Sequence, residues 1–211
     1  MTANKAPQLP LHAVQRADLA VEQQYDVPAG ARLVCLPEHD AALEAFPEVL
    51  DRRKVGAITG PLGTGKTILT AALIRRALQH NPELSVTSLT FELADTPRRA
   101  FEQVYRAITG QAAKGTRTDI QEELLPRLAE GERQRLLVLD EAHLSGSATL
   151  TQFVSLMRKP GANWSLLLVG SDLGGVLDRG HYVGSRVCKP THLQPLLEAD
   201  LRPYLCRFHP M

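Results

Sequence analysis

The stretch that decides the fold is VGAITGPLGTGKTILTAAL, residues 55–73. It begins with an apolar run that predicts a buried strand, Val55–Thr59, and it ends in the pattern of a helix over Lys66–Gln79. Between the two lies G-x-x-x-x-G-K-[ST] at residues 60–67, in the strand-to-helix setting that this motif requires. The stretch therefore predicts a phosphate-binding loop rather than an ordinary glycine-rich turn.

The residue types of this loop suit a nucleoside triphosphate. Glycines let backbone N–H groups approach a polyphosphate closely, and the N-terminus of the following helix adds partial positive charge. We expect Lys66 to reach the β- and γ-phosphates of ATP and the Thr67 hydroxyl to be a direct Mg²⁺ ligand. The expected nucleotide contacts are Gly60, Pro61, Leu62, Gly63, Thr64, Gly65, Lys66, Thr67 and Ile68.

Short apolar runs alternate with helical patterns along the rest of the chain. Further strands are expected at Val86–Phe91, Leu136–Leu139, Ser165–Val169 and Val187–Leu193. Helices are expected at Pro97–Ile108, Asp119–Leu128, Ser147–Arg158, Leu173–Arg179 and Glu198–Arg207. A helical pattern also follows Glu38, where Pro47 is expected to interrupt or kink it. This alternation predicts an α/β fold, a three-layer αβα sandwich around a parallel sheet whose strands are buried on both faces.

Composition and length indicate one globular domain. The chain has 211 residues, of which 44% are hydrophobic and 22% charged, and its net charge is +1, so no overall field marks a nucleic-acid partner. Residues 1–36 carry several prolines and are expected to form an arm with at most a short helix around Leu11–Val21. The core is expected over 37–195 and a last helix over 196–211. Without a long apolar run at the start, we expect a cytoplasmic protein without a membrane partner.

Two carboxylates follow the third expected strand. The run Leu136–Leu139 ends in Asp140 and Glu141, which places both acids at the carboxyl edge of the sheet, where open α/β sheets bind ligands. Asp140 is expected to hold Mg²⁺ through water and Glu141 to orient the attacking water. A kinase needs only the first acid, so the pair favours ATP hydrolysis. A pair of acids that merely solubilises a strand end is the alternative.

Two further residues are candidates for catalysis. Ser171 follows the fourth expected strand, and it either contacts the γ-phosphate or caps the next helix, since serine is a favoured N-cap. Arg186 lies in a polar loop before the last strand, where it is either an arginine finger that acts on a neighbouring subunit's nucleotide or a solvated surface residue.

Taken together, the P-loop, the strand that ends in DEAH, the strand that ends in VGS and the late Ser-Arg-Val resemble the AAA+ ATPases over roughly Glu38 to Arg207. The stretch LVGSDLGGVLDRGHYVGSRV, followed by LQPLLEADLRPYL, is similar to the transposition ATPases of the MuB, TniB and TnsC type and their ExeA-like relatives. The superfamily resemblance implies strand order 5-1-4-3-2 and nucleotide bound between subunits of a ring or filament. It gives Lys66 and Thr67 the Walker A roles, Asp140 and Glu141 the Walker B roles, Ser171 that of sensor 1 and Arg186 that of the finger.

Two departures from the AAA+ pattern affect the expected activity. The chain provides about one helix after the core, so we expect a vestigial lid without a sensor 2 arginine. Serine at the sensor 1 position is also less usual than asparagine or threonine. We therefore expect hydrolysis that is slow or stimulated by a partner.

The transposition group implies assembly on duplex DNA with ATP and recruitment or stimulation of a transposase. Basic clusters occur at Arg52-Arg53-Lys54, Arg75-Arg76, Arg98-Arg99 and Lys114 with Arg117. The first candidates for DNA contact are Arg98, Arg99, Lys114 and Arg117, although each cluster also fits a solvated helix face. The alternative functions are an ATP-gated protein-interaction switch of the ExeA-like kind and a helicase loader of the DnaC or IstB type.

Overall fold

The computed structural model describes residues 36–92, 96–129, 133–174, 181–188 and 190–197. In these ranges the chain forms five strands, β1 (Val55–Thr59), β2 (Ser85–Thr90), β3 (Arg135–Asp140), β4 (Trp164–Gly170) and β5 (Thr191–His192). All neighbouring pairs are parallel and the order is β2-β3-β4-β1-β5. Read from the β5 edge, this is the expected order 5-1-4-3-2.

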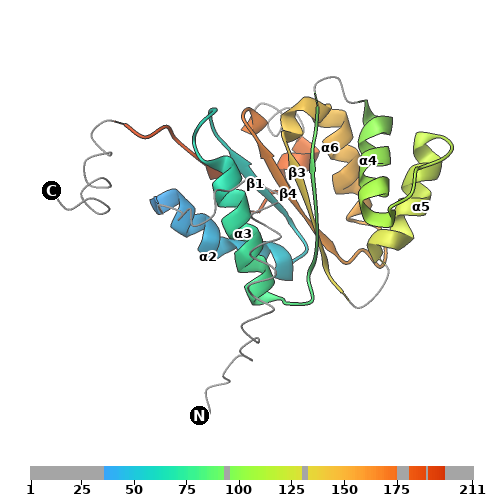
Figure 1. Cartoon of the computed structure of the whole chain (residues 1–211), viewed down its shortest axis with the longest axis horizontal. Helices are drawn as coiled ribbons and strands as arrows, with labels where there is room; N and C mark the ends of the chain where they lie inside the picture. Colours follow the sequence, from blue (N-terminus) through green and yellow to red (C-terminus); the bar gives the residue numbers. More distant parts are fainter. Residues whose placement is uncertain (1–35, 93–95, 130–132, 175–180, 189, 198–211) are drawn as a thin grey trace, which may run out of the picture.

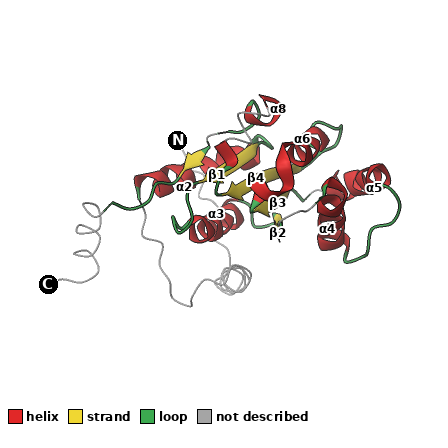
Figure 2. Ribbon diagram, turned by 90° about the horizontal axis from the view of Figure 1, so that it is seen from above, coloured by secondary structure: helices red, strands yellow, loops and turns green. Residues whose placement is uncertain are grey.

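Helices cover both faces of the sheet (Figure 1). One layer holds α2 (Pro37–Asp51) and α3 (Lys66–His80), and the opposite layer holds α4 (Pro97–Thr109), α5 (Arg117–Ala129) and α6 (Gly146–Leu156). A short 3-10 helix, η1 (Ala142–Ser145), joins β3 to α6, and α8 (His181–Gly184) lies beside α6 (Figure 2). The predicted three-layer α/β fold is confirmed.

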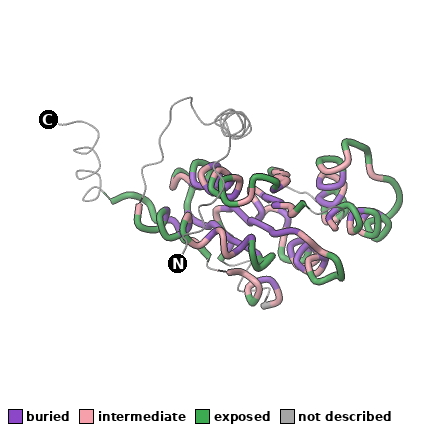
Figure 3. The backbone as a smooth tube through the Cα atoms, turned by 90° about the horizontal axis from the view of Figure 1, so that it is seen from below, coloured by how far each residue is buried: buried purple, intermediate pink, exposed green. Residues whose placement is uncertain are grey.

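The core consists of two apolar clusters, one on each face of the sheet. Successive strand residues point to opposite faces, so Leu137 and Leu139 pack beneath α4 and α6, whereas Leu136 and Val138 face α2 and α3. Every residue of β1 and β4 is buried, which places the buried layer along the centre of the molecule (Figure 3). This two-sided burial explains why these strands are continuous apolar runs.

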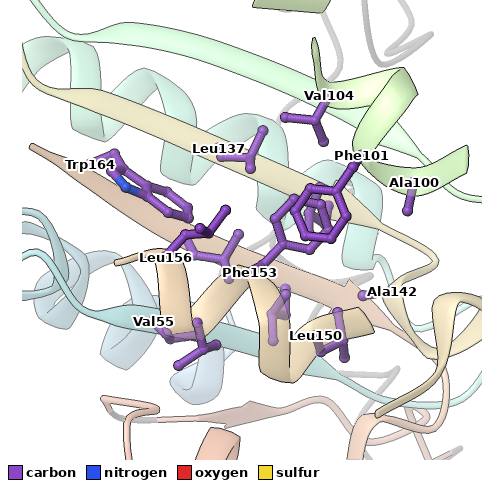
Figure 4. Packing of buried hydrophobic residues seen from close by; sticks show 14 of the residues in the cluster. Val55, Ala100, Phe101, Val104, Leu137, Ala142, Leu150, Phe153, Leu156 and Trp164 are labelled. Atoms are coloured by element: carbon purple, nitrogen blue, oxygen red, sulfur yellow. The ribbon is translucent and has the colours of Figure 1, made fainter. Parts of the chain in front are cut away.

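Aromatic stacking anchors the layer that holds α4 and α6 (Figure 4). The Phe101 ring of α4 and the Phe153 ring of α6 have centroids 4.2 Å apart, and both side chains are fully buried. The N-terminus of α4 is capped by the Thr96 side chain, which accepts a hydrogen bond from the Arg99 N–H.

One expected strand boundary is wrong, and the interruption considered at Pro47 is not observed. The last strand was expected over Val187–Leu193, but Val187 forms only an isolated bridge to Val55, and the ladder resumes at Thr191. Pro190 has no N–H to donate, and the chain between the bridge and the ladder is one residue longer than its partner on β1. Helix α2 runs through Pro47 without interruption, because Phe46, Val49 and Leu50 on its apolar face are held in the core.

Some expected elements lie outside the described residues. These are the short helix around Leu11–Val21, most of the helix Leu173–Arg179 and the lid helix Glu198–Arg207. Within the described ranges, no helix combines the length and the apolar character needed to cross a bilayer.

Candidate functional site

The loop between β1 and α3 has the backbone of a phosphate cradle (Figure 1). Gly63 and Gly65 adopt φ values of 80° and 84°, which residues with a Cβ rarely adopt. The left-handed turn at Gly65 starts α3 at Lys66, whose side chain is only 7% exposed. Its Nζ atom donates hydrogen bonds to the carbonyls of Gly60 and Pro61, both at 2.9 Å. The lysine charge is therefore held inside the curve of the loop.

The two acids occupy the end of β3. The Glu141 N–H donates to Asp140 Oδ1 at 2.9 Å, and Glu141 itself has a φ of 50°, in the left-handed region. Burial raises the pKa of the Asp140 carboxyl above its ordinary value, and the Glu141 charge adds to this rise. The Glu141 N–H and the charge of Lys66 lower the same pKa, which indicates that Lys66 and Asp140 lie within electrostatic reach of each other.

The end of β4 completes the same edge of the sheet. His143 Nδ1 lies 3.3 Å from Glu141 Oε2, outside hydrogen-bond geometry, and a Cβ built on Gly170 would stand 2.9 Å from the same nitrogen. The imidazole therefore fits between the second acid and a residue that has no side chain. Ser171 follows directly and is half-buried.

A side chain from β1 ties these strand ends together. The Thr59 hydroxyl accepts a hydrogen bond of 3.3 Å from the Leu173 N–H, and Thr59 pairs with Gly170 in the sheet register. This contact fixes the turn after β4 to the start of the phosphate loop, so Ser171 is held at the edge that also carries the acidic pair.

A cavity of about 340 Å³ adjoins the phosphate loop. Its walls come from Leu36 and His39 at the start of α2, from the loop itself, and from the segment after β5. The apolar part of the lining is Leu36, Leu62, Ile68, Pro195 and Leu196, of which Leu62 is 90% exposed. The cavity can take a planar apolar group attached to a phosphate chain.

The oxygen donors at this edge suit a magnesium ion. The Thr67 hydroxyl is exposed on the first turn of α3, and the Asp140 carboxylate is half-buried at the end of β3. A hydroxyl and a carboxylate are hard oxygen ligands, which Mg²⁺ prefers. The residues present therefore fit the ion that accompanies a nucleoside triphosphate.

The structure does not bring Arg186 to this edge. The residue precedes the bridge between Val187 and Val55, at the N-terminal end of β1, and five residues of strand separate that end from the phosphate loop, roughly 17 Å. Arg186 donates hydrogen bonds to the Tyr182 carbonyl at 2.7 Å and to Ser185 Oγ at 2.8 Å, and its guanidinium lies 3.7 Å from the centroid of the Tyr182 ring. It cannot reach the nucleotide site of its own chain.

The basic residues expected at a DNA interface differ in their surroundings. Arg98 pairs with Glu102 at 2.7 Å and Arg99 with Glu92 at 3.4 Å, so both carry carboxylate neighbours. Arg98 also donates to the Gly115 carbonyl, which brings it near the exposed segment that holds Lys114 and Arg117.

This combination of sheet order, phosphate loop and acidic strand end defines a P-loop ATPase of the AAA+ class. The model of the family AAA_22, described as an AAA domain, matches residues 49–174, which is more than half of the chain. The chain therefore belongs to this AAA family. No curated protein matches the sequence.

Solved structures share the fold at low sequence identity. Cdc6p of Pyrobaculum aerophilum has a TM-score of 0.65 and 18% identity, and Orc1 of Aeropyrum pernix in complex with DNA has 0.65 and 21%. In both cases 87% of this chain and 52% of the other are covered. Drosophila ORC bound to DNA has a TM-score of 0.56 and 14% identity, with 96% and 52% covered. The chain thus spans about half the length of these proteins, and the likeness shows the fold alone.

Several residues of the site were missed in the sequence. His39 and the segment Gln194–Leu196 line the cavity, and Thr59 and Gly170 join the strand ends. None of them stands in a motif with fixed spacing. The only available signal was position, because residues at the carboxyl ends of parallel strands meet at one edge.

Proposed function

We propose that this chain binds ATP with Mg²⁺ at the loop Gly60–Thr67 and hydrolyses the γ-phosphate. The observation that carries the proposal is the placement of Lys66, whose ammonium is held in the loop by the carbonyls of Gly60 and Pro61 at the sheet edge where Asp140 ends β3. A cation in the loop and a carboxylate opposite it are what a triphosphate and its metal ion need at the same time.

In this proposal the chain positions the nucleotide by its two ends. Backbone N–H groups of the loop and the Lys66 ammonium bind the β- and γ-phosphates, and the adjoining cavity takes the adenine ring against Leu36, Ile68 and Leu196. Thr67 and Asp140 would hold Mg²⁺, which neutralises phosphate charge when it is bound.

Glu141 is the proposed general base. Its carboxylate orients the attacking water and accepts its proton, while His143 and Gly170 limit where that carboxylate can lie. Ser171 at the end of β4 is proposed to contact the γ-phosphate or the water. The proposal predicts slow turnover for the isolated chain, because serine stands at the sensor 1 position, where asparagine or threonine is more usual.

We further propose that the chain assembles with copies of itself on duplex DNA and regulates transposition by recruiting or stimulating a transposase. The sequence similarity to the MuB, TniB and TnsC type supports this role. Among the proteins of similar fold, Orc1 of Aeropyrum pernix and Drosophila ORC are found in complexes with DNA, which supports the nucleic-acid part of the proposal.

The ATPase part is tested with Glu141→Gln. This variant should bind a fluorescent ATP analogue like the wild type, and its phosphate release should fall by about a hundredfold, as expected when a general base is removed. The matched control is Glu122→Gln, the same change at an exposed position of α5. Wild-type hydrolysis by Glu141→Gln would remove that residue from the mechanism, and a wild-type chain that does not bind ATP would refute the whole proposal.

The DNA part is tested by light scattering and electron microscopy of the full chain with duplex DNA. ATP should drive formation of large assemblies, and their formation should fall steeply with salt. Monomeric behaviour that does not depend on nucleotide would contradict the proposal. A specific protein partner without DNA affinity would favour the protein-interaction switch, and co-purification with a replicative helicase would favour the loader.

A further inference from the structure

A second pocket lies at the opposite edge of the sheet. It has a volume of about 210 Å³, and four of its lining residues are cations, namely Arg53, Lys54, Arg158 and Arg186. We call this feature the basic pocket. The four cations precede β1, β4 and β5 in the chain. Because these strands are parallel, the residues that precede them lie at the same N-terminal edge of the sheet. The pocket is therefore about the length of β1 away from the phosphate loop.

Among the described residues, no carboxylate pairs with the cations of the basic pocket. Within the described ranges, Arg53, Lys54, Arg158 and Arg186 form no ion pair, and the pocket lining contains no acidic side chain. Lys159, exposed and next to Arg158, adds a further charge that has no ion pair with any described residue. In a chain whose net charge is +1, this is a local concentration of positive charge.

Two of the guanidinium groups are held in place by neutral neighbours. Arg53 Nε donates to Asn163 Oδ1 at 3.0 Å, and Arg186 stacks on the Tyr182 ring while it donates to the Tyr182 carbonyl. Arginines that are already oriented bind phosphate oxygens with less loss of side-chain entropy.

We propose that the basic pocket binds a phosphate group of a nucleic-acid backbone, so that the N-terminal edge of the sheet is the DNA-contacting edge. The inference rests on the proposed assembly on duplex DNA and names its surface. The number of cations favours a nucleic-acid backbone over the ATP of a neighbouring subunit as the ligand. One finger arginine is enough for the terminal phosphate of ATP, whereas a nucleic-acid backbone presents several successive phosphate charges.

The pocket is a better candidate than the arginines of α4. Arg98 and Arg99 already have Glu102 and Glu92 as partners, so a phosphate would have to compete with these carboxylates. The cations of the basic pocket face no such competition among the described residues. The trans-finger role expected for Arg186 competes with this proposal for the same side chain, and the experiment separates the two.

The test measures binding of a fluorescein-labelled duplex to the full chain with Mg²⁺ and ATP over a salt series. The double variant Lys54→Ala, Arg158→Ala should bind about tenfold more weakly, and the slope of log affinity against log salt should fall by about 1–2. The control Arg98→Ala, Arg99→Ala removes the same charge from ion-paired positions and should change affinity less than about threefold.

A second variant, Arg53→Gly, distinguishes loss of a DNA contact from loss of folding. Arg53 has a φ of 50°, a conformation that glycine adopts freely, so Arg53→Gly removes a cation without straining the backbone. It should weaken DNA binding by about threefold with an unchanged thermal transition.

The outcomes are distinguishable. Wild-type affinity in the pocket variants, or a larger loss in the Arg98 and Arg99 control, would overturn this inference and leave the proposed function standing. Pocket variants that keep DNA affinity but lose ATP hydrolysis would instead assign the pocket to a neighbour's nucleotide. A wild-type chain without DNA affinity would overturn both proposals.

Discussion

The two edges of the sheet carry charge in different ways. At the C-terminal edge, one cation, Lys66, is buried in a loop of defined backbone, with Asp140 and Glu141 opposite. At the N-terminal edge, several cations line the basic pocket without a carboxylate among the described residues. The first arrangement is compensated and suits a ligand that brings both phosphate and metal. The second is uncompensated and suits a ligand that is only negative.

The separation of the two edges would let the chain bind its two proposed phosphate-containing ligands, ATP and DNA, at different sites. The strands hold the edges apart, and α6 connects them, because it begins after η1 at the acidic end of β3 and ends beside Arg158. Changes confined to one edge should therefore affect one ligand, whereas changes in α6 should affect both.

The largest effect is expected for Lys66→Ala. Two charge-assisted contacts with phosphate, each worth about 1.5–3 kcal/mol, would be lost, so ATP affinity should fall by about a hundredfold or more in titration calorimetry. In DNA-binding assays without nucleotide, Lys66→Ala and the wild type should behave alike, because the basic pocket is unchanged, whereas ATP-driven assembly on DNA should be lost in the variant. Arg106→Ala, which removes an exposed charge from α4, is the control. Weaker nucleotide-free DNA binding by Lys66→Ala than by the wild type would show that the two edges are not separate sites.

Phe153→Ala should destabilise the whole domain and so weaken both edges of the sheet together. Phe153 is fully buried against Phe101, and truncation of a buried aromatic ring costs about 3–5 kcal/mol in the free energy of unfolding. Urea denaturation measures this loss, and Phe153→Leu, which keeps most of the volume, should cost less than about 1.5 kcal/mol. A loss below about 1 kcal/mol for the alanine variant would contradict the observed packing.

The residues that meet at the C-terminal edge could be named from the sequence, because the phosphate loop and the acidic pair are each made of contiguous residues. The phosphate loop needs glycines and a lysine at set spacing, and the acids follow a strand that reads as a continuous apolar run. Four strands were located to within a residue at each boundary. Three of them, β1, β3 and β4, are continuous apolar runs because their central residues are buried on both faces, whereas β2 is largely half-buried.

The N-terminal edge could not be predicted in the same way. Arg53, Arg158 and Arg186 are distant in sequence and meet only because each stands before a strand of one parallel sheet. The pairing of Arg98 with Glu102 has the i,i+4 spacing of the expected helix Pro97–Ile108, so it could have been read from the sequence and used to rank the basic clusters. The helix α2 continues through Pro47 because tertiary packing outweighs the local preference of proline. The last strand is shorter than expected for a different reason, because the backbone hydrogen bonds around the bridge at Val187 limit it.

Gly170→Ala should separate turnover from binding at the C-terminal edge. The added Cβ would stand 2.9 Å from His143 Nδ1, so the imidazole and the nearby Glu141 carboxylate must shift. ATP hydrolysis should fall by about tenfold, since small misplacements of a catalytic group are costly, while ATP affinity stays close to that of the wild type. Gly174→Ala is the control, because nothing lies within 4 Å of its added Cβ. Wild-type turnover in Gly170→Ala would mean that His143 does not hold Glu141.

The smallest effect is expected from a matched pair of changes at Tyr182, at the N-terminal edge. The Arg186 guanidinium lies 3.7 Å from the ring centroid, and a cation–π contact of this kind is worth about 0.5–1 kcal/mol. Tyr182→Leu removes the ring and should weaken DNA binding by about two- to fivefold in the fluorescence assay. Tyr182→Phe keeps the ring and should lose less than half of that. An equal loss in both variants would mean that the Tyr182 hydroxyl, and not the stacked ring, orients the pocket.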